Sequence, residues 1–286
     1  MEKESKYKLI GHSAVLVTTL FSSINVPVSK YLTSSGVVSG EAVTLWRASV
    51  ACVCFWLISM FVPNSRNEKV APKDMLVLLG GAAFGMSFNL LAFLVGFKEV
   101  STIDASIIGS MIPLFTMVLA AVFLSEPISV RKVLGVAFGL AGGMLIIFSG
   151  VRGQLGGSSL WGIALHTFAA FSYGTYLIEN RSIASRYHPL TISRWMFLFA
   201  TLLLLPFVGR DLFCSPLLTG DYAGDVNTLD IWLGMLYVAL GNSVIGYMLV
   251  PVSLRYIRPT TASMYNYLQP LIASLIAILW GQDVLT

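Results

Sequence analysis

Amide and phenol side chains stand inside strongly apolar segments of this chain. The densest group is the run Tyr265–Gln269, directly before Pro270. On a helix, Tyr265 and Gln269 share one face because they are four residues apart. An unpaired amide is costly in hydrocarbon, so we expect these side chains to point inward. The candidate residues of this kind are Asn25, Asn89, Tyr173, Tyr176, Asn242, Tyr265, Asn266 and Gln269.

Two roles fit this set. The amides and phenols would line a cavity that binds a zwitterionic or polar aromatic solute. Alternatively, they would hydrogen-bond neighbouring helices to one another. The residue types alone leave both roles open.

Two arginines also lie inside apolar segments, Arg47 and Arg194. An arginine in a membrane is expensive unless it is paired or reaches the headgroups. Each would contact an anionic substrate or gate a pathway, or it would reach the headgroups or carbonyls of a neighbouring helix. Because the position is repeated, we predict a structural or gating role for both.

No sequence pattern predicts a catalytic site. The HExxH and GxSxG patterns are absent, and so is the GxxxxGK[ST] loop of ATP-driven proteins. The three cysteines show no CxxC or other metal-ligand spacing. The apolar segments carry no Asp or Glu near their centres, and His12 and His166 are the titratable candidates that remain. We therefore expect no enzyme, no metal and no cofactor.

The composition indicates a membrane protein. The chain is 56% hydrophobic and only 11% charged, with a mean hydropathy of +0.79, whereas soluble domains have about 25% charged residues. Its net charge of +4 is scattered over loops, so we expect no nucleic-acid partner. Lipid would surround such a chain.

The apolar residues fall into nine stretches of roughly the length of a membrane helix, about 20 residues. They are continuous rather than alternating, which excludes strands of a barrel. The stretches are Leu9–Tyr31, Ala42–Val62, Met75–Phe97, Thr102–Leu124, Val133–Ser149, Leu160–Ile178, Thr191–Val208, Ile231–Leu254 and Thr260–Trp280.

The basic residues predict the orientation. With the N-terminus in the cytoplasm, twelve Lys and Arg residues lie inside and four outside. This bias follows the positive-inside rule. We predict a multi-pass protein of the plasma or inner membrane with a cytoplasmic N-terminus and the acidic segment Gly209–Asp230 outside.

The chain repeats itself. Ala105–Ser106 matches Ala262–Ser263, and Pro113 matches Pro270 at the same offset. Further matched pairs are Arg47 with Arg194 and Gly11 with Gly162. The unit is five helices, over residues 1–150 and 151–286. An odd number of helices inverts the second copy relative to the first, which is typical of transporters.

The second copy stops before its fifth helix. The first continues after Glu126 with a glycine-rich helix, whereas the second ends at Thr286. We therefore expect a tenth helix after Thr286 in a complete ten-helix fold.

These features resemble the drug/metabolite transporter superfamily and, within it, the EamA family. The resemblance rests on Trp46–Arg47, on the run from Ala105 through Pro113 to Glu126, and on GVAFGLAGGMLIIFSG with their counterparts in the second half. Gln282 stands where the family usually has Glu. The resemblance implies an all-α fold and export or exchange of amino acids, other metabolites or drugs.

We therefore predict a secondary transporter, an exporter or exchanger of a small polar metabolite such as an amino acid. The alternatives are a carrier of sugar phosphates or nucleotide sugars, which would want several deep cations, and an intramembrane enzyme. A coupling ion, and a monomer or a homodimer, stay open. Pro113 and Pro270 would be matched hinges, since proline removes one helical hydrogen bond.

Overall fold

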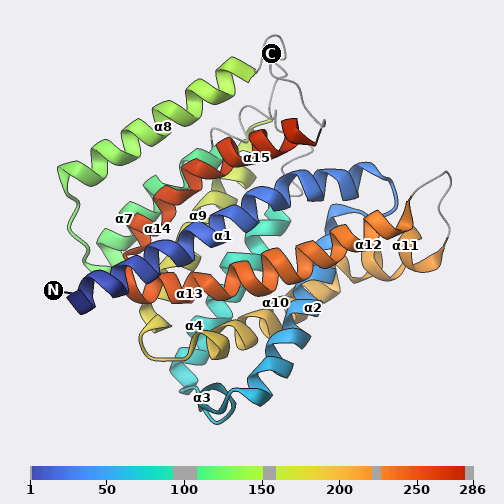
Figure 1. Ribbon diagram of the computed structural model, residues 1–286, viewed down its shortest axis with the longest axis horizontal. Coiled ribbons are helices and arrows are strands. Elements are labelled where there is room, and N and C mark those ends of the chain that lie inside the picture. Colours follow the sequence, from blue (N-terminus) through green and yellow to red (C-terminus); the bar gives the residue numbers. More distant parts are fainter. Residues whose placement is uncertain (1, 93–107, 151–158, 221–226, 281–286) are drawn as a thin grey trace.

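The computed structural model describes residues 2–92, 108–150, 159–220 and 227–280, and within them the chain is helical with no strand (Figure 1). Ala105–Ser106 and Gln282 lie outside the described residues. The longer helices are α1 (Glu2–Ser34), α2 (Gly40–Phe61), α4 (Pro72–Ala82), α7 (Ile112–Leu124), α8 (Val130–Gly150), α9 (Leu160–Ala184), α10 (Pro189–Phe213), α12 (Thr228–Leu236), α13 (Tyr247–Tyr256) and α15 (Leu268–Leu279).

Short or irregular helical segments join the longer ones. The π-helical segments are η1 (Ala83–Phe88) and η2 (Tyr237–Gly246), and η3 (Tyr265–Tyr267) is a 3₁₀ turn. The remaining short helices are α3 (Pro63–Arg66), α11 (Pro216–Thr219) and α14 (Pro259–Met264). The predicted eighth and ninth stretches are thus each built from three segments.

Five helical runs in the described part are long and apolar enough to cross a membrane. They are Ser5–Ser34, Gly40–Phe61, Pro72–Ala92, Pro189–Phe213 and Thr228–Tyr256, and Ile108–Leu124 is a shorter apolar helix. The chain is therefore an all-α protein with the helices of a membrane protein.

Local signals set the helix starts. Ser39 precedes α2 and accepts a hydrogen bond from the Ala42 amide at 3.1 Å. Ser159 does the same for α9 through the Gly162 amide, at 3.0 Å. A side-chain oxygen at this position satisfies an amide that has no partner within the helix. Both helices begin close to where the hydropathy pattern predicts them.

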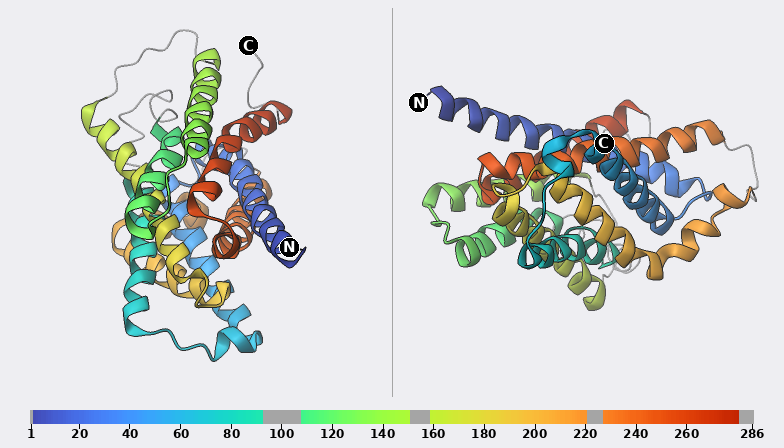
Figure 2. Two further views of the ribbon diagram at one scale, coloured as in Figure 1. Left: turned by 90° about the vertical axis from the view of Figure 1, so that its left-hand side faces the viewer. Right: turned by 90° about the horizontal axis from the view of Figure 1, so that it is seen from below.

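Helices from the two parts of the chain pack directly on one another. In α2 and α10, the rings of Phe55 and Phe197 lie 5.1 Å apart. Near the N-terminus, Tyr7 of α1 stacks on Tyr256 of α13 at 5.3 Å, and these two helices run side by side in Figures 1 and 2. Such burial of large aromatic area holds the two parts together.

Glycines permit the closest helix contacts. A Cβ at Gly85 would collide with the ring of Tyr176 in α9, and one at Gly139 would collide with the ring of Tyr267. Both glycines therefore pack against other helices of this chain. Through Gly139 the helix α8 contacts η3, and Figure 1 shows α8 at the margin of the bundle.

Two breaks occupy matching places in the fourth and ninth stretches. The helix is interrupted at Met111, and α7 restarts with Pro113 in its first turn. The ninth stretch passes through η3, and Pro270 stands in the first turn of α15. Proline has no N–H, so neither residue can donate to the carbonyl four residues before it, at Gly109 and at Asn266. Each proline thus follows an interruption of the α-helical geometry, a turn at Met111 and the 3₁₀ turn η3.

The structure extends one helix past its predicted end. The sixth stretch ends at Ile178 in the sequence, whereas α9 continues to Ala184. Glu179 therefore lies inside a helix, against Gly80 of α4. Its Oε2 atom is buried and lacks a hydrogen-bond partner within the described part. This carboxyl lies toward the end of α9, so the absence of acids near segment centres still holds for α9.

Candidate functional site

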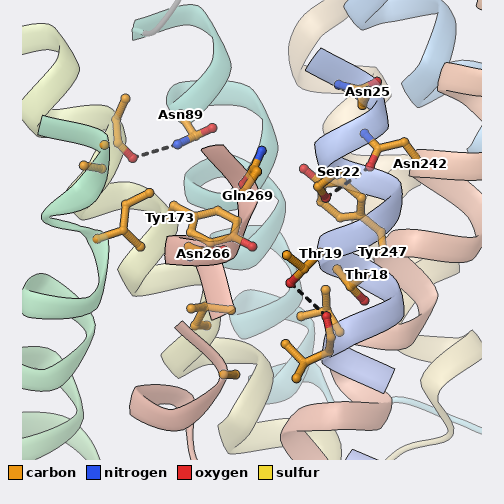
Figure 3. Close-up of a pocket in the computed structure, with 18 of the residues that line it drawn as sticks. Thr18, Thr19, Ser22, Asn25, Asn89, Tyr173, Asn242, Tyr247, Asn266 and Gln269 are labelled. Atoms are coloured by element: carbon orange, nitrogen blue, oxygen red, sulfur yellow. Dashed lines mark hydrogen bonds between the residues drawn. The ribbon is translucent and has the colours of Figure 1, made fainter. Parts of the chain in front are cut away.

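A cavity of about 330 Å³ opens among helices from both parts of the chain (Figure 3). Its walls come from α1, α2, α7, α9, η2, α13, α14, η3 and α15, and from the helical turns after η1 and before α7. The polar residues that line it are Thr18, Thr19, Ser22, Asn25, Arg47, Asn89, His166, Tyr173, Asn242, Tyr247, Ser253, Asn266 and Gln269.

The α1 wall is a stripe of hydroxyl and amide side chains. Thr18 donates to the carbonyl of Gly246, the last residue of η2, at 3.1 Å. Ser22 donates to Oδ1 of Asn242 at 3.3 Å (Figure 3). These bonds join α1 to the segment where η2 ends, so the wall is held across two parts of the chain.

The opposite wall carries Asn89 and Tyr173. Asn89 donates through Nδ2 to the carbonyl of Ala169 in α9, at 2.7 Å. Tyr173 lies on α9 one turn further on and faces the space between the walls in Figure 3. One amide therefore joins two helices and also borders the cavity, so the two predicted roles are not exclusive.

Two amide atoms at the cavity have no protein partner among the described residues. They are Oδ1 of Asn25 and Nδ2 of Asn266, and both are buried. A buried amide without a partner costs free energy that water or a solute can recover. Both residues line the cavity, and protein atoms enclose these two amide atoms themselves.

Arg47 also borders the cavity. Its Nε donates to Oγ of Ser243 at 2.9 Å, and its Cζ lies 5.5 Å from the centre of the Tyr247 ring. Ser243 in turn donates to the carbonyl of Val238 at 2.9 Å. The guanidinium is therefore held from one side, and its two terminal nitrogens are left for other contacts.

Arg194 has a different environment from its sequence counterpart. It is 6% exposed, donates to Oγ of Ser59 at 2.6 Å and lies over the ring of Trp56 at 5.2 Å. A further bond reaches the carbonyl of Glu68. Arg194 ties α10 to α2 and does not line the cavity.

Six of the eight predicted binding residues line the cavity, and Tyr176 and Tyr265 do not. Tyr176 is 2% exposed and packs into the space left by Gly85. The hydroxyl of Tyr265 bonds Nδ1 of His12 at 2.9 Å. Pro113 and Pro270 are also outside the lining. Tyr176 and Tyr265 face away from the cavity because each contacts a neighbouring helix on another side, Tyr176 at Gly85 and Tyr265 at His12.

Sequence reasoning missed the hydroxyls of α1. Thr18, Ser22 and Asn25 recur at helical spacing of three to four residues on one face. That spacing was the signal, but threonine and serine are common in membrane helices, where they bond their own backbone. Thr19 does so here, to the carbonyl of Val15 at 2.9 Å.

The lining positions of the two parts correspond. Val15, Thr18, Thr19 and Ser22 of α1 relate to His166, Ala169, Ala170 and Tyr173 of α9 by the same offset as Gly11 to Gly162. Likewise, Gly109 and Ile112 relate to Asn266 and Gln269 by the offset of Pro113 to Pro270. The two π-helical segments share the pattern Ala-x-Gly-x-Ser, at Ala83 and at Ala239.

Comparison with known families gives two matches to one family model. The model of the EamA-like transporter family matches residues 9–148 and matches again over residues 160–286. The chain belongs to the EamA-like transporter family. It is accordingly a multi-pass membrane protein of the drug/metabolite transporter superfamily.

Two of three relatives of the EamA-family chain carry transporter names. An uncharacterized transporter of Bacillus subtilis, YyaM, is 22% identical over 270 residues, which is 93% of this chain and 84% of that protein. A probable terminal-alkyne amino-acid exporter of Streptantibioticus cattleyicolor is 27% identical over 241 residues, 84% of this chain and 76% of that protein. Protein PecM of Dickeya dadantii is 27% identical over 212 residues, 74% of this chain and 67% of that protein.

A solved crystal structure has the same fold. It superposes with a TM-score of 0.75 at 19% sequence identity, and the match covers 99% of this chain and 90% of the other. At that identity the likeness concerns the fold alone.

Proposed function

We propose that this EamA-family protein is a secondary transporter that moves a small polar metabolite, such as an amino acid, across a cell membrane. The observation that carries the proposal is the cavity of about 330 Å³, which both matched parts of the chain line with hydroxyl, amide and phenol groups. Sites of this size, with a few convergent polar groups, are typical of small-molecule binding.

Alternating access is the proposed mechanism. A transporter built from inverted repeats places its site at the repeat interface and rocks one unit against the other. The corresponding lining positions in α1 and α9 support such a pair of units. The sequence holds no ATP-binding loop, so we propose that a gradient of the substrate or of a coupled ion drives transport, with the N-terminus in the cytoplasm.

Amino acids are the first substrates to test. The Streptantibioticus relative is named as an amino-acid exporter, and amide and hydroxyl groups suit both the ammonium and the carboxylate of an amino acid. These amide and hydroxyl groups both donate and accept hydrogen bonds, so they also suit a polar side chain of the amino acid.

The test is counterflow into proteoliposomes. Vesicles holding the protein would be loaded with a mixture of unlabelled amino acids, and uptake of each labelled amino acid would be measured. We expect saturable uptake of at least one. Asn266→Ala should reduce its affinity about ten-fold, since a hydrogen bond in a buried site contributes about 1.4 kcal/mol.

The control is Leu271→Ala on the same helix, α15, where the side chain is 56% exposed and faces away from the cavity. Uptake by this variant should equal that of the unmodified protein. Uptake of sugar phosphates or nucleotide sugars, with none of amino acids, would overturn the proposed substrate.

A further inference from the structure

We infer that Arg47 is the anchor for a carboxylate group of the transported solute. The inference rests on the proposed function and names the chemical class of its substrate. It starts from the placement of Arg47, which borders the cavity of about 330 Å³ and also a smaller space beside it that Asn89, Leu90 and Tyr247 share.

The guanidinium is oriented but not neutralised. Ser243 accepts its Nε at 2.9 Å, and the ring of Tyr247 lies under its Cζ. Neither partner is charged. Within the described part of the chain, the Nη1 and Nη2 atoms have no hydrogen bond or ion pair. Four N–H donors of Arg47 therefore remain, in the planar fork that matches a carboxylate with two parallel bonds.

The described lining of the cavity supplies no counter-charge. Among the described lining residues there is no Asp and no Glu, and Arg47 is the one side chain that is always charged. An arginine inside a helix bundle is costly unless a negative group approaches it. A solute with a carboxylate would provide that group each time it binds.

One arginine favours a single negative charge. A phosphate ester carries nearly two charges at neutral pH and is usually held by several cations. The remaining described lining is hydroxyl, amide, phenol and apolar, apart from His166. Asn266 and Asn25 also line the cavity, and their side-chain amides can donate to and accept from other polar groups of the same solute.

The experiment compares matched acids and amides. Binding of L-alanine, L-serine, L-leucine and L-phenylalanine to the purified protein would be measured by titration calorimetry, beside the corresponding amino-acid amides and O-phosphoserine. The amide keeps the ammonium and the side chain and loses only the negative charge. We expect the unmodified protein to bind at least one acid ten-fold more tightly than its amide.

The Arg47→Gln variant should remove this preference. Its affinity for the acid should fall ten-fold or more, while its affinity for the amide should stay within a factor of two. Arg47→Lys keeps the charge without the fork and should retain part of the preference. Should Arg47→Gln not fold, Ser243→Ala leaves the arginine in place without its Nε acceptor, and it should weaken acid binding several-fold and amide binding little.

Four results would overturn the inference. The first is equal binding of acid and amide by the unmodified protein, and the second is an equal loss of both affinities in Arg47→Gln. The third is Arg47-dependent binding of O-phosphoserine that is tighter than the binding of serine. The fourth is no binding of any acid at about ten millimolar, a concentration that would stabilise even a weak complex. Counterflow separates the two proposals. Transport that Arg47→Gln leaves unchanged refutes the anchor alone, whereas Arg47-dependent binding without transport refutes the proposed function alone.

Discussion

At the scale of the residue, two arginines in matching sequence positions have different surroundings. Arg47 borders a cavity, with only Nε bonded to the protein in the described part. Arg194 is enclosed, with bonds to Ser59 and to the Glu68 carbonyl. A repeated sequence position therefore does not imply a repeated role, because the neighbours that contact each residue differ.

This contrast predicts that Arg194 acts on stability. Arg194→Gln loses a charged hydrogen bond to Ser59 and the stacking on Trp56, so we expect the unfolding free energy to fall by about 2 kcal/mol. Thermal melting of the purified protein would measure this. Substrate affinity, measured by calorimetry below the melting temperature, should not change.

The control for this prediction is Arg210→Gln, an exposed arginine near the end of the same helix. It should change stability by less than about 0.5 kcal/mol. A normal melting temperature in Arg194→Gln, with weakened substrate binding, would contradict a structural role.

At the scale of the element, the helix breaks before Pro113 and Pro270 are the features that connect structure to motion. Gly109 and Asn266, each four residues before a proline, line the cavity. Proline has no N–H to donate to the backbone carbonyls of Gly109 and Asn266, so each helix can bend beside the site. We interpret the two breaks as paired hinges.

Replacing the hinge prolines should slow transport without harming the fold. In Pro113→Ala and Pro270→Ala, the restored N–H allows a continuous helix across the break, which makes bending harder. We expect counterflow rates about ten-fold lower, from about 1.4 kcal/mol of added barrier, with unchanged substrate affinity and an equal or higher melting temperature.

Pro206→Ala is the matched control, since Pro206 lies inside α10 with an exposed side chain away from the cavity. Its rate should be normal. Normal rates in both hinge variants would rule out a hinge role for these prolines.

At the scale of the whole molecule, the native cysteines offer a test of orientation. Cys214 is exposed at the end of α10, whereas Cys52 is buried and Cys54 half-buried within α2. The N-terminus of α1 and the corner between α10 and α11 lie at opposite ends in Figure 1. With a cytoplasmic N-terminus, Cys214 should face the outside.

A membrane-impermeant maleimide should therefore label intact cells that express the protein, at one site. The Cys214→Ser variant should lose the label, and this variant identifies the reacting residue. Labelling of Cys214 in inside-out vesicles but not in intact cells would reverse the predicted orientation.

Hydropathy alone determined the class of protein and most helix positions, because the thickness of the bilayer demands a minimum length of apolar helix. The apolar runs around Arg47 and Arg194, for example, correspond to α2 and α10. The motifs around the two matched prolines likewise indicated the EamA family, which the family comparison confirmed.

Tertiary structure alone decided which polar residues meet. Asn25, Asn89 and Asn266 border one cavity, whereas Tyr176 and Tyr265, of equally suitable type, face away from it. Composition and spacing specify that a residue is polar and on which helix it stands. The direction in which its side chain points depends on packing against segments far away in the chain, such as Gly85 against Tyr176, and no local pattern encodes that contact.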